Sequence, residues 1–150
     1  MRKFVLDTNI IIHLVRNSDT WKLIDRTYKP INAPNESYLS FATLAEIHSL
    51  SIQLNWGIKK QQRLEDILAN FTIVNIDHRL LLPYIEIDTF SQGKHPSMSL
   101  PLGLSARNMG KNDIWIAATA LALKAELLTT DKDFEHLKGV LEDVHCVVMQ

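Results

Sequence analysis

The sequence predicts an α/β sandwich built around a mainly parallel sheet. Short apolar segments suited to buried strands alternate with longer segments suited to helices, and polar turns separate them. The chain shows no internal repeat and no low-complexity tract. Its 150 residues, of which 46% are hydrophobic, suffice for one sizeable core. We therefore expect a single domain over residues 1–150.

The first half of the chain opens on a unit of strand, polar turn and helix. Lys3–Leu6 is a short apolar run suited to a buried strand. Asp7, Thr8 and Asn9 follow it and supply helix-capping side chains before an apolar helical segment. The other elements expected in this half are helices over residues 21–28, 41–56 and 59–69 and strands over residues 37–39 and 71–76.

The segment 41–56 is the clearest helix of this half, because it contains neither Gly nor Pro, and Gly57 is positioned to end it. A polar stripe on this helix, made of Thr43, Glu46 and Gln53, is of the kind that ordinarily faces solvent. Four apolar residues are expected to share one face of the same helix, and these are Phe41, Leu44, Ala45 and Ile52.

The second half contains a long basic loop. Residues 91–112 hold several Gly and Pro residues together with Lys94, Arg107 and Lys111, and no acidic residue. The preceding helix, over residues 78–90, tolerates Pro83 if this residue lies in the first turn. After the loop we expect a helix over 114–123 that is buried on most sides, a strand over 126–130, a short helix over 133–138 and a last strand over 144–149.

Composition narrows the classes of function. Sixteen basic and seventeen acidic residues give a formal charge of −1, so nucleic-acid binding would depend on local patches and not on the overall field. The only cysteine has no partner for an internal disulfide, and neither zinc-finger spacing nor other metal-ligand spacing is visible around the six histidines. Asp7 interrupts the apolar N-terminal stretch. We expect a soluble, unprocessed cytoplasmic protein without membrane partners.

Four acidic residues are expected to converge at one edge of the sheet. Asp7 and Asp131 follow strands, and the carboxyl ends of parallel strands meet at the same edge. Asp113 begins the buried helix, and Glu46 lies about two turns into the helix after the second strand, so both can lean over that edge. Asp133 is a second candidate at the last position, but the strand-end geometry favours Asp131.

Clustered carboxylates repel one another and raise each other's pKa values, so such a site requires a divalent cation. Hard oxygen ligands select Mg²⁺ or Mn²⁺. A cation of this kind can activate water and stabilise the charge that develops on a phosphodiester during in-line attack. The acidic residues therefore indicate hydrolysis of a nucleic-acid backbone.

Other polar residues next to these positions have supporting roles in this interpretation. Thr8, Asn9 and Thr130 flank the expected ligands and could hydrogen-bond to the carboxylates or to water on the metal. The candidates for contact with RNA phosphates are Lys94, Arg107 and Lys111 of the basic loop.

Four segments of the sequence resemble the PIN-domain family and, within it, the VapC-type toxins of bacterial toxin–antitoxin pairs. Any one of these motifs is weak, but four in this order and at these intervals are specific, and together they span nearly the whole chain. The segments are Val5-Leu-Asp-Thr-Asn-Ile10, Ser40-Phe-Ala-Thr-Leu-Ala-Glu-Ile47, Asn112-Asp-Ile-Trp-Ile-Ala-Ala118 and Leu128-Thr-Thr-Asp-Lys-Asp-Phe134.

The resemblance implies a three-layer α/β/α sandwich with a Rossmann-like central sheet, which is the PIN-domain fold. It also implies a Mg²⁺- or Mn²⁺-dependent endoribonuclease, a homodimer, and a protein antitoxin that covers the site. The metal-binding and catalytic residues that it implies are Asp7, Glu46, Asp113 and Asp131.

Each carboxylate also has a purely structural interpretation. Asp7 could merely cap a helix, and Asp131 could merely form a turn. Asn112 can cap the buried helix, which leaves Asp113 without an obvious structural role. For Glu46, only the family pattern favours a functional role over a solvent-exposed position on a helix.

Two other functions stay open at this point. One is a Mg²⁺-dependent phosphoacceptor or phosphatase domain, which also places Asp at strand ends, although Asp7 lacks the second aspartate of an Asp-x-Asp pair. The other is a non-catalytic PIN-like binding module, which the four acidic residues disfavour.

Overall fold

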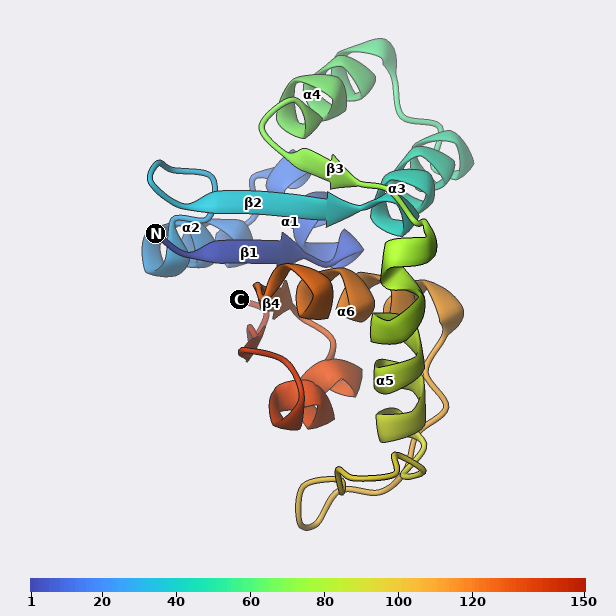
Figure 1. Cartoon of the computed structure of the whole chain (residues 1–150). Coiled ribbons are helices and arrows are strands. Elements are labelled where there is room, and N and C mark those ends of the chain that lie inside the picture. The colour runs from blue at the N-terminus through green and yellow to red at the C-terminus, as the bar shows by residue number, and fades with distance from the viewer.

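The computed structural model describes residues 1–150 and contains one sheet of five strands, all of them parallel. The strand order is β3-β2-β1-β4-β5, so the first strand of the chain lies at the centre. The arrowheads of β1, β2 and β3 point the same way, toward the side where α3 begins (Figure 1). The strands are β1 (Lys3–Leu6), β2 (Glu36–Ser40), β3 (Thr72–Val74), β4 (Glu126–Thr129) and β5 (Val144–Cys146).

Helices cover both faces of this sheet, which confirms the predicted sandwich (Figure 1). One apolar core lies between the sheet and α1 to α4, and the other lies between the sheet and α5, α6 and η2. None of the helices is long and apolar enough to cross a lipid bilayer. The helices are α1 (Thr8–Arg16), α2 (Asp19–Tyr28), α3 (Phe41–Gln53), α4 (Ile58–Leu68), α5 (Leu81–Ser91) and α6 (Lys111–Leu123), with 3-10 helices η1 (His78–Leu80) and η2 (Lys132–Gly139).

The alternation of side chains along β1 explains the apolar run Phe4–Leu6. Phe4 and Leu6 belong to one core and Val5 to the other, and all three are fully buried. A central strand with helices on both faces has no solvent side, so its covered positions are apolar. Polar residues occur only at its two ends, at the partly buried Lys3 and at Asp7.

The order of the strands places a switch point beside Asp7. From β1 the chain adds β2 and β3 on one side and then returns to add β4 and β5 on the other. Leu6 of β1 pairs with Leu128 of β4, and the Asp7 amide donates to the Leu128 carbonyl at 2.9 Å. Functional groups of open α/β sheets gather at such a switch point, outside the carboxyl ends of the strands.

Several element boundaries differ from those expected. β3 and β5 have three residues each and are shorter than predicted. The segment after β3 divides into η1 and α5, and Pro83 lies in the first turn of α5, as predicted. The capping prediction for Asn112 is wrong, because α6 begins at Lys111 with Gly110 at its N-cap, so Asn112 lies inside the first turn.

The orientation of α3 is the largest departure from expectation. Its buried residues are Ala42, Thr43, Ile47 and Ser51. Of the four residues expected on the apolar face, Phe41, Ala45 and Ile52 are exposed, and only Leu44 is partly buried against the core. Ile52 is 72% exposed and Phe41 is 47% exposed. The side toward the sheet carries small and polar groups because it adjoins the acidic edge. Gly57 is also not the stop that was expected, since α3 ends at Gln53 and Gly57 is the N-cap of α4.

Substitutions on the two faces of α3 test this orientation. Ile47→Ala is expected to lower the free energy of unfolding by about 2–5 kcal/mol, because it leaves a cavity in the core beside β1. Ile52→Ala is expected to change it by less than about 0.5 kcal/mol, because the side chain is exposed. Urea unfolding measures both values. The opposite ranking would show that the face containing Phe41 and Ile52 is the buried one.

Candidate active site

The structure brings the four predicted carboxylates together at the carboxyl edge of the sheet. Asp7 ends β1, Glu46 comes from α3, Asp113 from the first turn of α6, and Asp131 follows β4. The charges of Glu46 and Asp131 raise the pKa of Asp7, and those of Asp7, Asp131 and Glu46 raise the pKa of Asp113. Four elements that are distant in sequence thus contribute to one acidic cluster.

Two threonines connect three of the four acidic residues through side-chain and backbone hydrogen bonds. Thr8 Oγ1 donates to Glu46 Oε1 at 3.0 Å, while the Thr8 amide donates to Asp7 Oδ1 at 2.7 Å. On the other side, Thr129 Oγ1 donates to Asp7 Oδ2 at 2.8 Å and accepts from the Asp131 amide at 2.9 Å. Both oxygens of Asp7 are therefore held in fixed directions between Glu46 and Asp131.

Asp7 is the most buried member of the cluster, with 5% of its surface exposed. Burial raises its pKa to about 6, and the charges of Glu46 and Asp131 add to this, whereas the bonds from Thr129 and Thr8 oppose it. Asp7 also caps α1. The interpretation of Asp7 as a helix cap is therefore correct. A capping role alone, however, does not require a buried position beside two further carboxylates.

Asp113 lies in the first turn of α6 and is half-buried. Burial raises its pKa to about 6, followed by the charges of Asp7, Asp131, Glu46 and Asp133. The positive end of the α6 dipole favours a carboxylate at this place. No side chain caps α6, so the backbone N–H groups at its start are open toward the acidic cluster.

Glu46 is positioned by the orientation of α3. Its neighbours Thr43 and Ile47 are fully buried, so this side of the helix faces the protein and not solvent. Thr43 Oγ1 lies 3.3 Å from Thr8 Oγ1 and can donate to it, because the one hydroxyl proton of Thr8 goes to Glu46. Of the polar stripe that the sequence predicts to face solvent, Thr43 and Glu46 therefore line the site, whereas Gln53 is exposed as expected.

Asp131 and Asp133 differ in their surroundings. Asp131 is half-buried, caps η2 by accepting from the Asp133 amide at 2.9 Å, and contacts Thr129 through its own amide. Asp133 is exposed, and its Oδ1 lies 3.7 Å from the Arg107 guanidinium. The geometry keeps Asp131 as the stronger candidate of the two.

The three polar residues expected beside the ligands are placed differently from one another. Thr8 makes the expected contact, Asn9 is exposed without a side-chain hydrogen bond, and Thr130 makes no side-chain hydrogen bond either. The hydroxyl that bonds to Asp7 belongs to Thr129. Strand alternation could have identified it, because Asp7 and Thr129 continue the sheet face of Val5 and Leu127, whereas Thr130 continues the opposite face.

The three basic residues expected to contact RNA differ in their position relative to the carboxylates and in how free their side chains are. Lys111 is exposed and begins α6, two residues before Asp113. Arg107 is less free, since its guanidinium donates to the Lys132 carbonyl at 3.2 Å beside Asp133. Lys94 is exposed just after α5, where its amide donates to the Thr89 carbonyl, and it contacts none of the four carboxylates.

The acidic cluster fits a divalent cation. Its donors are all carboxylate oxygens, the set that Mg²⁺ and Mn²⁺ prefer. Burial raises the pKa values of Asp7 and Asp113, and the negative charges of the neighbouring carboxylates raise them further. No Lys or Arg forms an ion pair with Asp7, Glu46, Asp113 or Asp131. A bound cation would supply the missing positive charge.

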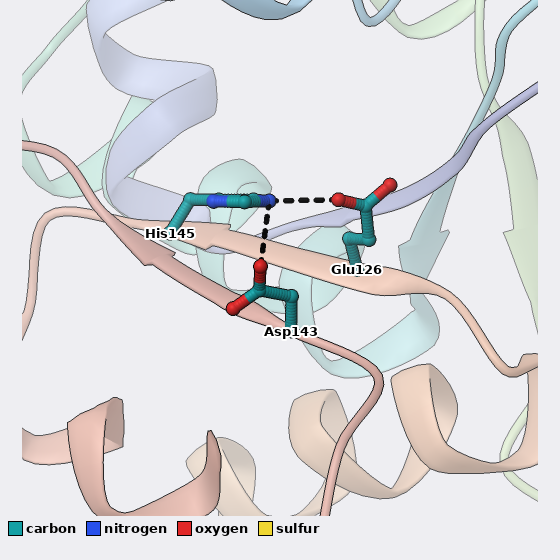
Figure 2. A group of neighbouring side chains, drawn as sticks. All are labelled: Glu126, Asp143 and His145. Carbon is teal, nitrogen blue, oxygen red and sulfur yellow. Dashed lines mark hydrogen bonds and ion pairs between the residues drawn. The ribbon is translucent and has the colours of Figure 1, made fainter.

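The one group of three possible ligands whose ligand atoms all lie within 4.8 Å of one another is elsewhere, at the opposite end of the sheet, where β4 and β5 begin (Figure 2). No three of the four carboxylates at the carboxyl edge are this close in the metal-free protein. His145 Nε2 is 2.8 Å from Glu126 Oε1 and 3.8 Å from Asp143 Oδ2. Arg2 donates to both oxygens of Glu126, at 2.6 and 2.8 Å, and this bond lowers the pKa of Glu126. These residues form an ion-pair network, which the sequence did not reveal because its members come from separate strands.

A substitution of Thr8 tests the role of its hydroxyl. Thr8→Val removes the bonds to Glu46 and Thr43 and keeps the backbone bond to Asp7. We expect Mn²⁺ affinity to fall by about 10-fold or more, as for other residues that orient metal ligands. Isothermal titration calorimetry measures the affinity, with Thr8→Ser as the control that restores the hydroxyl. Equal affinities for the Val and Ser variants would contradict this role.

Together the parallel sheet and the carboxylate cluster define an α/β protein with an acidic site at its topological switch point. The chain belongs to the PIN-domain family, whose model, described as "PIN domain", matches residues 4–140.

Similar proteins narrow the group within this family. The chain is 30% identical over 135 residues to "Ribonuclease VapC1" of Haemophilus influenzae strain R2866, covering 89% of this chain and 91% of the relative. The fold matches VapBC2 of Rickettsia felis bound to a DNA fragment from its promoter, with a TM-score of 0.71, 22% identity and coverage of 95% and 97%. It also matches VapBC-1 of nontypeable H. influenzae, with a TM-score of 0.69, 23% identity and coverage of 95% and 96%. The recognised resemblance to VapC-type proteins is thus confirmed.

Proposed function

We propose that this protein is a Mg²⁺- or Mn²⁺-dependent endoribonuclease that hydrolyses RNA phosphodiester bonds and acts as the toxin of a type II toxin–antitoxin pair. Membership of the PIN-domain family and similarity to a relative named Ribonuclease VapC1 support this proposal. The observation that carries it is the continuous hydrogen-bonded path from Glu46 through Thr8, Asp7 and Thr129 to Asp131. Such a path fixes carboxylate directions, as a metal centre requires.

In this proposal Asp7, Glu46, Asp113 and Asp131 hold the cation and are the catalytic residues. When bound, the cation supplies a more acidic water and electrostatic stabilisation of the phosphodiester in its transition state. Thr8 and Thr129 fix the oxygens of Asp7 and Glu46 through hydrogen bonds. Asn9 and Thr130 stand at the margin of the site, where they can bond to water.

The basic residues of the loop and of α6 contact the RNA backbone. Lys111 is the best placed, because it is exposed and lies on the same helical turn as Asp113. Lys94 and Arg107 complete the predicted set. Phosphate contacts of this kind position the strand without reading its sequence.

A protein antitoxin covers part of this surface in the cytoplasm. The solved structures most similar to this fold include VapBC proteins and FitAcB from Neisseria gonorrhoeae, the latter with a TM-score of 0.68 and 21% identity. The turn between α3 and α4 exposes large apolar side chains, among them Ile58, which is 90% exposed, and Leu54. Exposed apolar side chains gathered at one turn are typical of a protein contact.

A second apolar surface supports the homodimer. The first two turns of α5 expose Leu81, Leu82 and Ile85, and Leu82 is 71% exposed. Leu82→Asp is expected to convert the dimer to a monomer, because a charge cannot be buried in an apolar contact without a partner. Light scattering after size exclusion measures the mass. Ile58→Asp is the matched control and should leave the dimer intact; a Leu82→Asp protein that stays dimeric would exclude this surface.

The proposed activity is tested with purified protein and RNA. Cleavage with Mg²⁺ or Mn²⁺, loss of cleavage with EDTA, and growth arrest on expression are the expected results. A short neighbouring reading frame whose product relieves the arrest would identify the antitoxin. Formation of an acyl phosphate on an aspartate would support the phosphoacceptor alternative instead. A protein that takes up no Mn²⁺ would be a non-catalytic binding module.

A further inference from the structure

A hollow of about 460 Å³ adjoins the acidic cluster on the side of Asp131. One wall consists of α1 residues spaced as on a single helical face, and these are Asn9, Ile12, His13 and Arg16. The eight residues from Asn9 to Arg16 span about 10 Å along the helix. The other wall consists of Thr130, Asp131, Lys132 and Met149. The hollow therefore extends along α1, away from the carboxylates.

Two cations line this hollow and have no acidic partner. Arg16 and Lys132 are exposed, and neither forms an ion pair or a side-chain hydrogen bond. Arg107, by contrast, is engaged with Lys132 O and Asp133. Arg16 and Lys132 are consequently free to bind an anion.

The ring of His13 adds a hydrogen-bond donor. Ser18 Oγ accepts from the Trp21 amide at 3.1 Å and lies 2.9 Å from His13 Nδ1. His13 Nδ1 is the only acceptor within reach of the Ser18 hydroxyl proton, so we assign this proton to the bond with Nδ1, and in this tautomer the proton of the neutral ring is on Nε2. Burial and the charge of Arg16 lower the pKa of His13, so the ring is neutral at neutral pH.

The opposite side of the acidic cluster differs in charge. The hollow beside Glu46 has a volume of about 360 Å³ and contains no basic residue. Its lining residues are Ala45, Glu46, Ser49, Leu50, Gln53 and Asn112. A nucleic-acid backbone, which is negatively charged throughout, gains attraction only on the side with cations.

We infer that the hollow along α1 binds a phosphate of the RNA strand adjacent to the bond that is cut, with Arg16 and Lys132 as positioning residues and His13 Nε2 as a donor. The inference rests on the proposed nuclease function and deepens it, since it assigns the path of the strand. The same geometry places the strand across Asp131 on its way to the other carboxylates.

Two measurements with a fluorescent single-stranded RNA test this site. Anisotropy in EDTA gives binding as a function of salt, and cleavage in Mn²⁺ gives KM and kcat. Arg16→Ala and Lys132→Ala should each raise KM roughly three- to tenfold, with kcat near that of the parent, and each should reduce the salt slope of binding by about 0.7. Arg26→Ala and Lys138→Ala are matched controls, because these exposed cations lie on α2 and η2 outside the hollow.

The two proposals fail in different ways. If the parent protein cuts RNA but Arg16→Ala and Lys132→Ala behave like the controls, the site along α1 is excluded and the nuclease remains. If the parent does not cut RNA but the two variants still lose salt-dependent binding, the site remains and the nuclease is excluded. A parent protein that neither binds nor cuts RNA overturns both.

Discussion

Asp7→Asn is expected to reduce metal-dependent RNA cleavage by at least about a hundredfold while the fold is retained. The amide removes the negative charge at the centre of the cluster, between Glu46 and Asp131. Its carbonyl oxygen can still accept from the Thr8 amide, and the Thr129 hydroxyl can turn to accept from its NH₂ group. Initial rates of cleavage in Mn²⁺, with circular dichroism to verify folding, measure the effect.

Asp133→Asn is the matched control for this experiment. Asp133 is an exposed carboxylate near the cluster, and its loss should leave most of the activity. Growth arrest on expression should follow the same order, with relief by Asp7→Asn only. Cleavage that survives both Asp7→Asn and EDTA would exclude the metal-dependent mechanism.

Mn²⁺ affinity should rise with pH, because Asp7 and Asp113 must lose their protons to bind a cation. Burial raises both pKa values to about 6 in the metal-free protein. The ionised fraction of a carboxyl with this pKa is about tenfold lower at pH 5 than at pH 7. Because both Asp7 and Asp113 must be ionised, Mn²⁺ affinity is expected to be about a hundredfold lower at pH 5 than at pH 7. Calorimetric titration at several pH values, in buffers of different ionisation enthalpy, measures both the affinity and the protons released.

The stability of the metal-free protein should change in the opposite direction. A raised pKa in the folded state stabilises the fold at pH values below the ordinary 3.8, and this contribution is lost as pH rises through about 6. The metal-free Tm should therefore fall across this range, and less so in Asp7→Asn, which has no charge to bury there. An affinity for Mn²⁺ that does not vary between pH 5 and pH 7 would contradict the proposed ligands.

The fold could be predicted from the sequence because its strands are short, apolar and regularly followed by helices. The bounds Lys3–Leu6 were predicted correctly, and the apolar run Phe4–Leu6 follows from burial on both faces. The ends of β3 and β5 could not be predicted, because pairing with a neighbouring strand decides where a strand stops. The orientation of α3 could not be predicted from the sequence either. Apolar residues normally mark the buried face of a helix, but in α3 the apolar residues Phe41 and Ile52 are exposed.

The candidate site was predictable to different degrees. Strand ends indicated Asp7 and Asp131, and the start of a buried helix indicated Asp113. Glu46 depended on resemblance, because only the packing of α3 shows that Thr43 and Ile47 turn this side inward. Thr129 was missed in favour of Thr130, although strand alternation places Thr129 on the same sheet face as Asp7; the pairing of β1 with β4 then brings its hydroxyl to Asp7.

The central claim is that the four carboxylates of the switch point, and no other group, hold the catalytic cation. Crystals of the protein soaked in Mn²⁺ and measured near the manganese absorption edge test it most directly. We predict an anomalous peak within ligand distance of Asp7 and at least one of Glu46, Asp113 and Asp131. A peak only at Glu126, Asp143 and His145, at the opposite end of the sheet, would contradict the claim.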